Sequence, residues 1–225
     1  MHIEPGLVAE GKIWLSVATA AGAGACGFKL AWEDVKEHGT VSLAARAAIA
    51  TALVFGFFEV LPHYPVGVSE VHFIFGTTLF LLFGSAAAAI GLALGLLCQG
   101  LFFAPADLPQ YFMNVTTLLV PLFGIRYLAE KIIDPGTSYV DLKYSQVLAL
   151  SATYQAGIVA WVGFWTLYGQ GFGAENLQSL AMFGGAYLLV IIVEPLADLA
   201  VLAGAKALRF LRGSPFVVQR LFHTA

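Results

Sequence analysis

Long apolar stretches, separated by short polar ones, run along the whole chain. Seven of them equal or approach the roughly 20 apolar residues that a helix needs to cross a bilayer. They cover residues 13–32, 44–61, 71–83, 85–103, 112–129, 145–169 and 177–203. The pattern predicts an all-α fold, a polytopic membrane helix bundle with seven transmembrane helices, and it leaves no room for a soluble catalytic domain.

The third and fourth stretches join into one apolar run over residues 71–104, in which His72 and Gln99 are the strongly polar side chains. The run is too long for one ordinary span and short for two full ones. Gly84-Ser85 interrupts it with residue types that are common in turns. We therefore expect a tight hairpin of two spans that turns at this dipeptide.

The positions of lysine and arginine favour the hairpin, because cytoplasmic loops carry an excess of both. If Met1 lies outside and 71–104 forms two spans, Lys12 stays outside and the other basic side chains face the cytoplasm. A single span there would place most of them outside. The sequence therefore predicts an outer N-terminus and a cytoplasmic C-terminus in a multi-pass protein of the cell inner (plasma) membrane. The predicted cytoplasmic residues are Lys29, Lys36, Arg46, Arg126, Lys131, Lys143, Lys206, Arg209, Arg212 and Arg220.

Composition excludes several protein classes. Charged residues make up 11% of the chain and apolar residues 59%, whereas an average soluble domain has about 25% charged residues. The formal net charge of -3 argues against the basic stripe of a nucleic-acid-binding surface. The chain contains no Gly-x-x-x-x-Gly-Lys-Ser/Thr phosphate loop, so we expect no ATPase site and no enzyme activity of its own.

A few polar and charged side chains lie in or near the apolar stretches, among them Arg46, Gln99 and Glu194. Such residues normally face the interior of a helix bundle or a cavity. Pro195 removes a helix hydrogen bond, so we expect a kink in the last span, with Glu194 near the freed carbonyl groups. We do not expect a proton relay at this position.

The motif Gly91xxxGly95 in the fourth stretch allows two helices to approach closely. We expect it to serve helix packing within this chain. A docking face for another membrane subunit is the alternative.

Three histidines gather on the predicted outer side: His2, His63 and His72. Imidazole suits divalent Ni, Co, Cu and Zn. A metal bound by the Met1 α-amine could also take the His2 backbone nitrogen and the His2 Nδ1, which closes a five-membered and a six-membered ring. One further imidazole would complete a square of four nitrogens, the geometry that Ni(II) and Cu(II) prefer.

His72 is a better candidate than His63 for the fourth nitrogen, because it opens an apolar segment in which an imidazole without a ligand or hydrogen bond is costly. Glu59, near the outer end of the second span, is a candidate for orienting a ligand imidazole. Structural alternatives stay open at each position. His2 would then be an ordinary terminal residue, His72 a hydrogen-bonded helix-end residue, His63 a loop residue and Glu59 a structural hydrogen-bonding group.

The start Met1-His2-Ile3, followed by an acidic residue and Gly6, and the loop from Gly67 to His72 resemble the substrate-binding membrane subunits of cobalt and nickel energy-coupling factor (ECF) transporters, the CbiM/NikM family. The resemblance covers roughly residues 1–130 and includes the stretch from Met113-Asn114 to Pro121-Leu122-Phe123. It implies that Met1, His2 and His72 hold the metal. Candidates of lower rank are His63, Glu59 and Asn114.

The resemblance and the topology together predict an integral-membrane substrate-capture subunit of an ATP-driven Co²⁺ or Ni²⁺ uptake transporter. The ion is then a transported ligand, and no permanent cofactor is expected. The implied partners are a coupling transmembrane subunit, cytoplasmic ATPase subunits and a small accessory membrane subunit. A histidine-ligated haem or quinone redox protein and a small-solute channel without metal are the alternatives.

The predicted organisation is a single integral-membrane domain over residues 1–225. It comprises an N-terminal metal-binding segment at 1–12, the helix bundle at 13–203 and a basic cytoplasmic tail at 204–225. The N-terminus lacks the positive start of a cleavable signal peptide, so we expect no cleavage.

Overall fold

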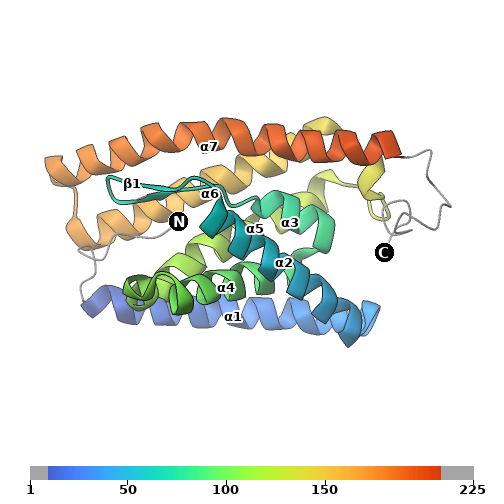
Figure 1. Cartoon of the computed structure of the whole chain (residues 1–225), viewed down its shortest axis with the longest axis horizontal. Coiled ribbons are helices and arrows are strands. Elements are labelled where there is room, and N and C mark those ends of the chain that lie inside the picture. The colour runs from blue at the N-terminus through green and yellow to red at the C-terminus, as the bar shows by residue number, and fades with distance from the viewer. Residues whose placement is uncertain (1–9, 209–225) are drawn as a thin grey trace.

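A computed structural model describes residues 10–208, which form seven α-helices and one short β-hairpin (Figure 1). The helices are α1 (Glu10–His38), α2 (Thr40–Val60), α3 (Gly76–Phe83), α4 (Ser85–Phe102), α5 (Tyr111–Ile132), α6 (Tyr144–Gln170) and α7 (Ala174–Ala207). Strands β1 (Tyr64–Val66) and β2 (Ser69–Val71) follow α2, and the 3-10 helices η2 (Pro105–Gln110) and η3 (Tyr139–Asp141) precede α5 and α6.

Six of the seven helices in the described range are long and apolar enough to cross a membrane. The exception is α3, which has only eight residues. The prediction of a transmembrane helix over 71–83 is therefore wrong for its first half, which contains the end of β2 and a non-helical stretch up to Phe75. A short apolar run has no periodicity that separates strand from helix, and here it forms both.

The turn between α3 and α4 lies where the sequence predicts it. Gly84 has a φ of 84°, in the region that favours glycine, and its N–H donates to the Phe80 carbonyl oxygen at 2.9 Å. The run 71–104 is thus a hairpin, in which the non-helical stretch up to Phe75 and the short helix α3 together form the first arm and α4 forms the second.

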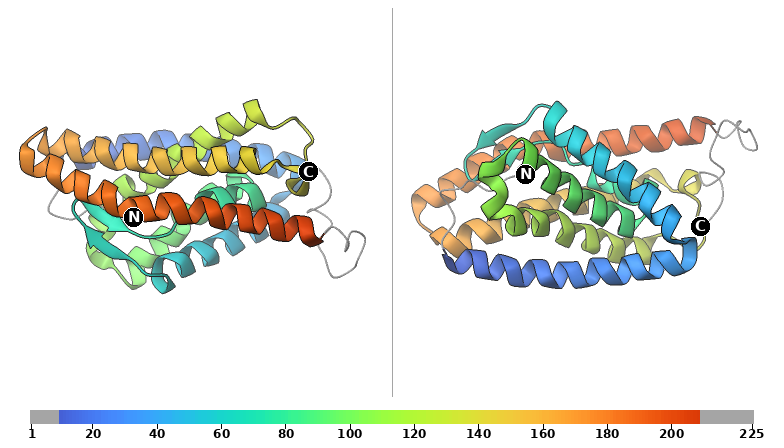
Figure 2. Two further views of the ribbon diagram at one scale, coloured as in Figure 1. Left: turned by 90° about the horizontal axis from the view of Figure 1, so that it is seen from above. Right: turned by 60° about the horizontal axis from the view of Figure 1, so that its bottom comes forward.

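The β-hairpin, which the sequence analysis did not foresee, lies against α7 (Figure 2). Tyr64 pairs with Val71 and Val66 pairs with Ser69. At the turn, Gly67 has a φ of 62°, and a Cβ there would lie 2.1 Å from the Ser179 backbone oxygen of α7. The absence of a side chain at this turn therefore lets the hairpin approach the backbone of α7.

Helices α4 and α5 lie in the middle of the bundle, between α1 on one side and the α6–α7 pair on the other (Figure 1). Close packing joins α2 to α4, because a Cβ at Gly91 would lie 2.5 Å from the Ala50 Cβ and one at Gly95 would lie 2.6 Å from a Val54 methyl carbon. The expectation that Gly91xxxGly95 packs within this chain is confirmed.

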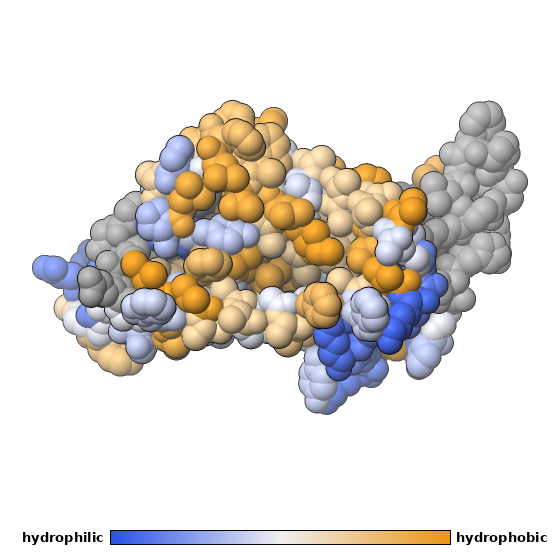
Figure 3. All heavy atoms as spheres, turned by 90° about the horizontal axis from the view of Figure 1, so that it is seen from below, coloured by the Kyte–Doolittle hydropathy of each residue, from blue (hydrophilic) through white to orange (hydrophobic). Residues whose placement is uncertain are grey.

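The face that α1 covers is mainly apolar across its middle, and its strongly hydrophilic residues gather toward the ends (Figure 3). On α1 the large side chains Trp14, Phe28 and Trp32 are exposed. Exposed aromatic and aliphatic side chains along helices of this length are typical of a surface that contacts lipid.

Candidate functional site

His72 directly follows β2 and is buried, with 2% of its surface exposed. Its ring packs edge-on against Phe58 of α2, with 4.5 Å between the ring centroids. Its Nδ1 lies 3.2 Å from the Phe73 carbonyl oxygen. When the proton is on Nδ1, the ring donates it to this oxygen, which is how metal-binding histidines are usually oriented.

His63 lies at the same open end of the β-hairpin, because Tyr64 and Val71 form the last pair before the two histidines. It is only half-buried, and its Nδ1 lies 3.1 Å from the Leu61 carbonyl oxygen. The hairpin thus brings the two loop histidines to one end of the bundle. Burial distinguishes them, since His72 lies inside the packed structure.

The remaining predicted ligands, Met1 and His2, lie outside the described residues. Within residues 10–208, no group of three or more His, Cys, Asp and Glu side chains could hold a metal ion. A metal site at His72 therefore needs donors of another kind or from outside this range.

Asn114 and Glu59 stay predictions. Asn114 lies in the first turn of α5 and is 1% exposed. Glu59 is half-buried near the end of α2, and the hydrogen bonds described for His63 and His72 go to backbone carbonyl groups rather than to its carboxylate.

Glu194 of α7 forms a hydrogen bond with the backbone two residues after His72. Its Oε1 accepts a hydrogen bond from the Ile74 backbone N–H, and its Oε2 accepts one from the Gln155 Nε2 of α6. The Tyr187 hydroxyl donates to the Gln155 Oε1 at 2.6 Å, which fixes the orientation of the amide. Glu194 is 1% exposed, so the prediction that it faces the bundle interior is confirmed.

Asp198 lies one turn further along α7 and was missed in the sequence analysis. Its Oδ1 accepts a hydrogen bond from the Thr78 hydroxyl of α3, and its Oδ2 accepts one from the Ser151 hydroxyl at 2.6 Å. The sequence could have indicated it, because a second acidic residue four positions after Glu194 in the same apolar stretch is expected to face the bundle interior. α7 continues through Pro195 as a single helix, so both carboxylates lie on one element.

Arg46 of α2 is 7% exposed and contacts the other end of α3. Its Nη1 donates to the Phe83 carbonyl oxygen at 2.6 Å, and its Nη2 is paired with the Asp34 carboxylate of α1. The prediction that Arg46 faces the interior is confirmed.

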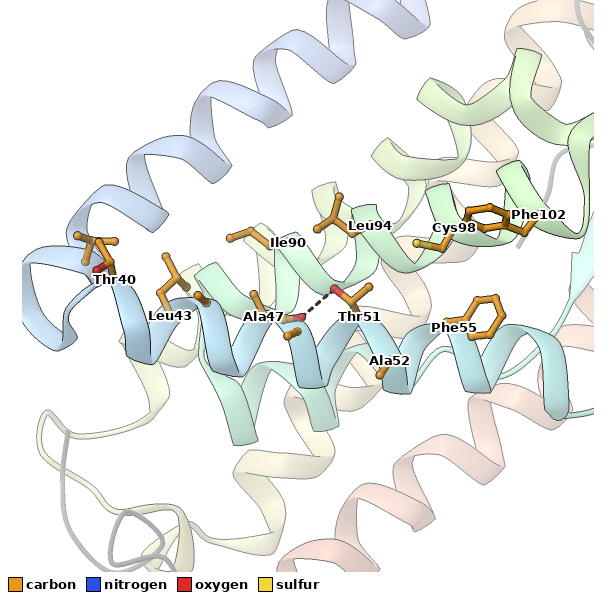
Figure 4. Close-up of a pocket in the computed structure, with 13 residues that line it drawn as sticks. Thr40, Leu43, Ala47, Thr51, Ala52, Phe55, Ile90, Leu94, Cys98 and Phe102 are labelled. Carbon is orange, nitrogen blue, oxygen red and sulfur yellow. Dashed lines mark hydrogen bonds between the residues drawn. The ribbon is translucent and has the colours of Figure 1, made fainter.

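A groove of about 840 Å³ between α2 and α4 is a poor candidate for a metal site (Figure 4). Its wall consists of apolar side chains such as Leu43, Phe55 and Leu94, with Thr40, Thr51 and Cys98 as the polar or thiol members. The Thr51 hydroxyl donates to the Ala47 carbonyl oxygen at 2.8 Å. The groove therefore presents no imidazole or carboxylate to an ion.

Two solved structures share the fold of this chain. A crystal structure of a transition metal transporter is 20% identical, with a TM-score of 0.68, and the match covers 96% of this chain and 98% of that one. A crystal structure of a truncated transition metal transporter is also 20% identical, with a TM-score of 0.61 and coverage of 93% and 98%. No curated protein sequence gave a significant match.

A family profile described as the cobalt uptake substrate-specific transmembrane region matches residues 2–210. The similarity thus extends well beyond the roughly 130 residues over which the motifs are visible, and it includes α6 and α7. The chain is a multi-pass membrane component of metal uptake, and it belongs to the CbiM family.

Proposed function

We propose that this chain captures Co²⁺ or Ni²⁺ at the outer face of the inner membrane for an ATP-driven ECF uptake transporter. The Met1 amine, the His2 backbone nitrogen, the His2 Nδ1 and the His72 Nε2 form the four-nitrogen site. The observation that carries the proposal is the buried imidazole of His72, which directly follows the β-hairpin and whose Nδ1 faces the Phe73 carbonyl oxygen, as in many metal-binding histidines.

The mechanism is binding followed by release toward the cytoplasm, without covalent chemistry. The chain has no phosphate-binding loop. In this proposal, cytoplasmic partner subunits hydrolyse ATP, and a coupling transmembrane subunit passes their conformational change on to this chain. The N-terminus is outside and the C-terminus is cytoplasmic in this proposal, as the one-sided distribution of lysine and arginine indicates.

Titration of the purified full-length chain, prepared without a chelating tag, tests the capture function directly. We expect one Ni²⁺ or Co²⁺ per chain with a calorimetric heat that depends on pH, because metal binding must displace a proton from the α-amine, which titrates near pH 7.7–8.0 when free. Affinity should therefore rise as the pH approaches that value from below. A chain that binds neither ion at any pH between 6 and about 8 would contradict the proposal.

The β-hairpin gives a second test, because its turn approaches the backbone of α7. Gly67→Ala combines a positive φ, which costs an L-residue about 1–2 kcal/mol, with a clash against the Ser179 backbone oxygen. The hairpin must then move away from α7 and take His72 with it. We expect metal affinity to fall about 10–100-fold, as it does when a group that orients a ligand is lost.

Gly171→Ala is the matched control for this change. Gly171 has a φ of 69°, and a Cβ there would meet no other described atom within 4 Å. The control therefore also places alanine at a positive φ, but without the contact. Calorimetry should show that Gly171→Ala retains the affinity of the wild type, and equal losses in both variants would mean that the docking of the hairpin on α7 is unimportant for the metal.

A further inference from the structure

Helix α3 is held at each end by a side chain from another helix. At its start, the Glu194 carboxylate of α7 accepts the Ile74 N–H, and at its end the Arg46 guanidinium of α2 donates to the Phe83 carbonyl oxygen. Ile74 lies two residues before the first residue of α3, and Phe83 carries one of the last carbonyl groups of the helix, which have no partners within it. The helix dipole favours a positive group at the end of a helix, where the Arg46 guanidinium lies.

Packing also restricts movement of α3. A Cβ at Gly76 would lie 2.2 Å from the ring of Tyr154, so the first turn rests directly on α6. The Thr78 hydroxyl donates to Asp198 of α7, and Leu79 is completely buried. At the other end, a Cβ at Gly84 would lie 3.5 Å from the Arg46 Nη1.

Three residues connect His72 to the start of α3. The His72 Nδ1 faces the Phe73 carbonyl oxygen, and the next residue, Ile74, donates its N–H to Glu194. A shift of α3 along its axis therefore moves the backbone group that orients the His72 ring.

The end of α3 is connected to the predicted cytoplasmic end of the bundle. Arg46 bridges Phe83 to Asp34 of α1, and the other Asp34 oxygen lies 3.0 Å from the His38 Nδ1. Eight residues at 1.5 Å per residue make α3 about 12 Å long. One rigid element thus extends from an ionic cluster at the cytoplasmic end toward the loop at the outer end.

We propose that Glu194 and Arg46 are positioning residues that hold α3 at its two ends and so set the place of the His72 imidazole in the metal site. The inference rests on the proposed function, in which His72 supplies the fourth nitrogen. It adds that a substitution of Arg46, at the far end of α3, changes the coordination of the ion. A partner that separates α2 from α1 at Asp34 and Arg46 would loosen the metal by the same route.

Electron paramagnetic resonance of Cu²⁺ bound to the purified full-length chain tests this inference. The wild type should show four nitrogen donors. Arg46→Gln and Glu194→Gln should keep four nitrogen donors but change the g and copper hyperfine values, because the His72 ring is displaced rather than lost, and calorimetry should show about tenfold weaker binding, the effect typical of lost groups around a ligand. Arg46→Lys keeps the positive charge and should restore most of the wild-type spectrum.

Arg126→Gln is the matched control, because Arg126 of α5 forms ion pairs with Glu33 and Glu130 and is bound to no residue of α3 in the described contacts. It should retain the wild-type spectrum. Thr78→Val, which keeps the side-chain shape and removes the hydrogen bond to Asp198, provides a milder change if Arg46→Gln fails to fold. It should shift the spectrum in the same direction by a smaller amount.

The outcomes separate the inference from the function. A wild-type chain that does not hold Cu²⁺ through four nitrogens contradicts the proposed metal site itself. A four-nitrogen wild type whose Arg46→Gln, Glu194→Gln and Thr78→Val variants keep its spectrum and affinity overturns the positioning role alone. A variant with less folded protein and an unchanged line shape also counts against positioning, because a purely structural defect reduces the amount of signal and leaves its shape.

Discussion

Alanine in place of His72 is expected to abolish tight binding of Ni²⁺ and Co²⁺. The change removes one of the proposed donors and leaves the ion with an incomplete square. It also removes a side chain that is 2% exposed, so thermal unfolding must be measured with and without metal to show that the variant is folded. Calorimetric titration of the full-length chain then gives the loss of affinity directly.

His63→Ala is the matched control, because His63 is the other histidine at the open end of the β-hairpin and it is only half-buried. This change should cost much less affinity than His72→Ala. If His63→Ala destroys binding and His72→Ala spares it, the fourth nitrogen belongs to His63. If neither change matters, the β-hairpin takes no part in the metal site.

One extra residue before Met1 is expected to reduce metal affinity as severely as the loss of His72. The added residue converts the Met1 amine into an amide and moves the free amine away from the His2 nitrogens, so the fused five- and six-membered rings cannot form. Removal of a donor nitrogen is far more damaging than a change in the groups around the ligands. Calorimetry with Ni²⁺ and Co²⁺ measures the effect.

One extra residue after Ala225 is the control for that extension, because it lengthens the chain equally at the opposite terminus. It should leave affinity unchanged. An extended N-terminus that retains wild-type affinity would refute the terminal site, whereas His72 could still bind metal with other donors.

The helix bundle could be predicted from the sequence to a large extent. Six of the proposed spans correspond to helices in the described range, and the break at Gly84 is confirmed. The error at 71–83 has a physical cause. Residues 69–75 are held by contacts with α7, such as the one between Ile74 and Glu194, and local apolar character carries no information about a partner that lies so far away in the sequence.

The candidate site was predictable in part for the same reason. The cost of an imidazole in an apolar segment pointed to His72, which is 2% exposed in the structure, and its role as a metal ligand stays a prediction. The cost of a buried charge placed Glu194 and Arg46 in the interior, but it could not name their partners. Those partners are the Ile74 N–H just before α3 and the Phe83 carbonyl oxygen at its end. They could be identified only once the bounds of α3 were known, and Phe75, which has a φ of 54°, is the residue directly before that helix.

The hydrogen bond between Ile74 and Glu194 also constrains the order of biogenesis. The two residues are 120 positions apart, so the ribosome has made α4, α5 and α6 before the carboxylate exists. Until α7 is inserted, the non-helical backbone before α3 has no Glu194 to accept its N–H, and exposed N–H groups are costly within a bilayer. The β-hairpin and α3 therefore reach their final depth late, after the last helix has left the translocon, and chains that end before Glu194 should be substrates for membrane quality control.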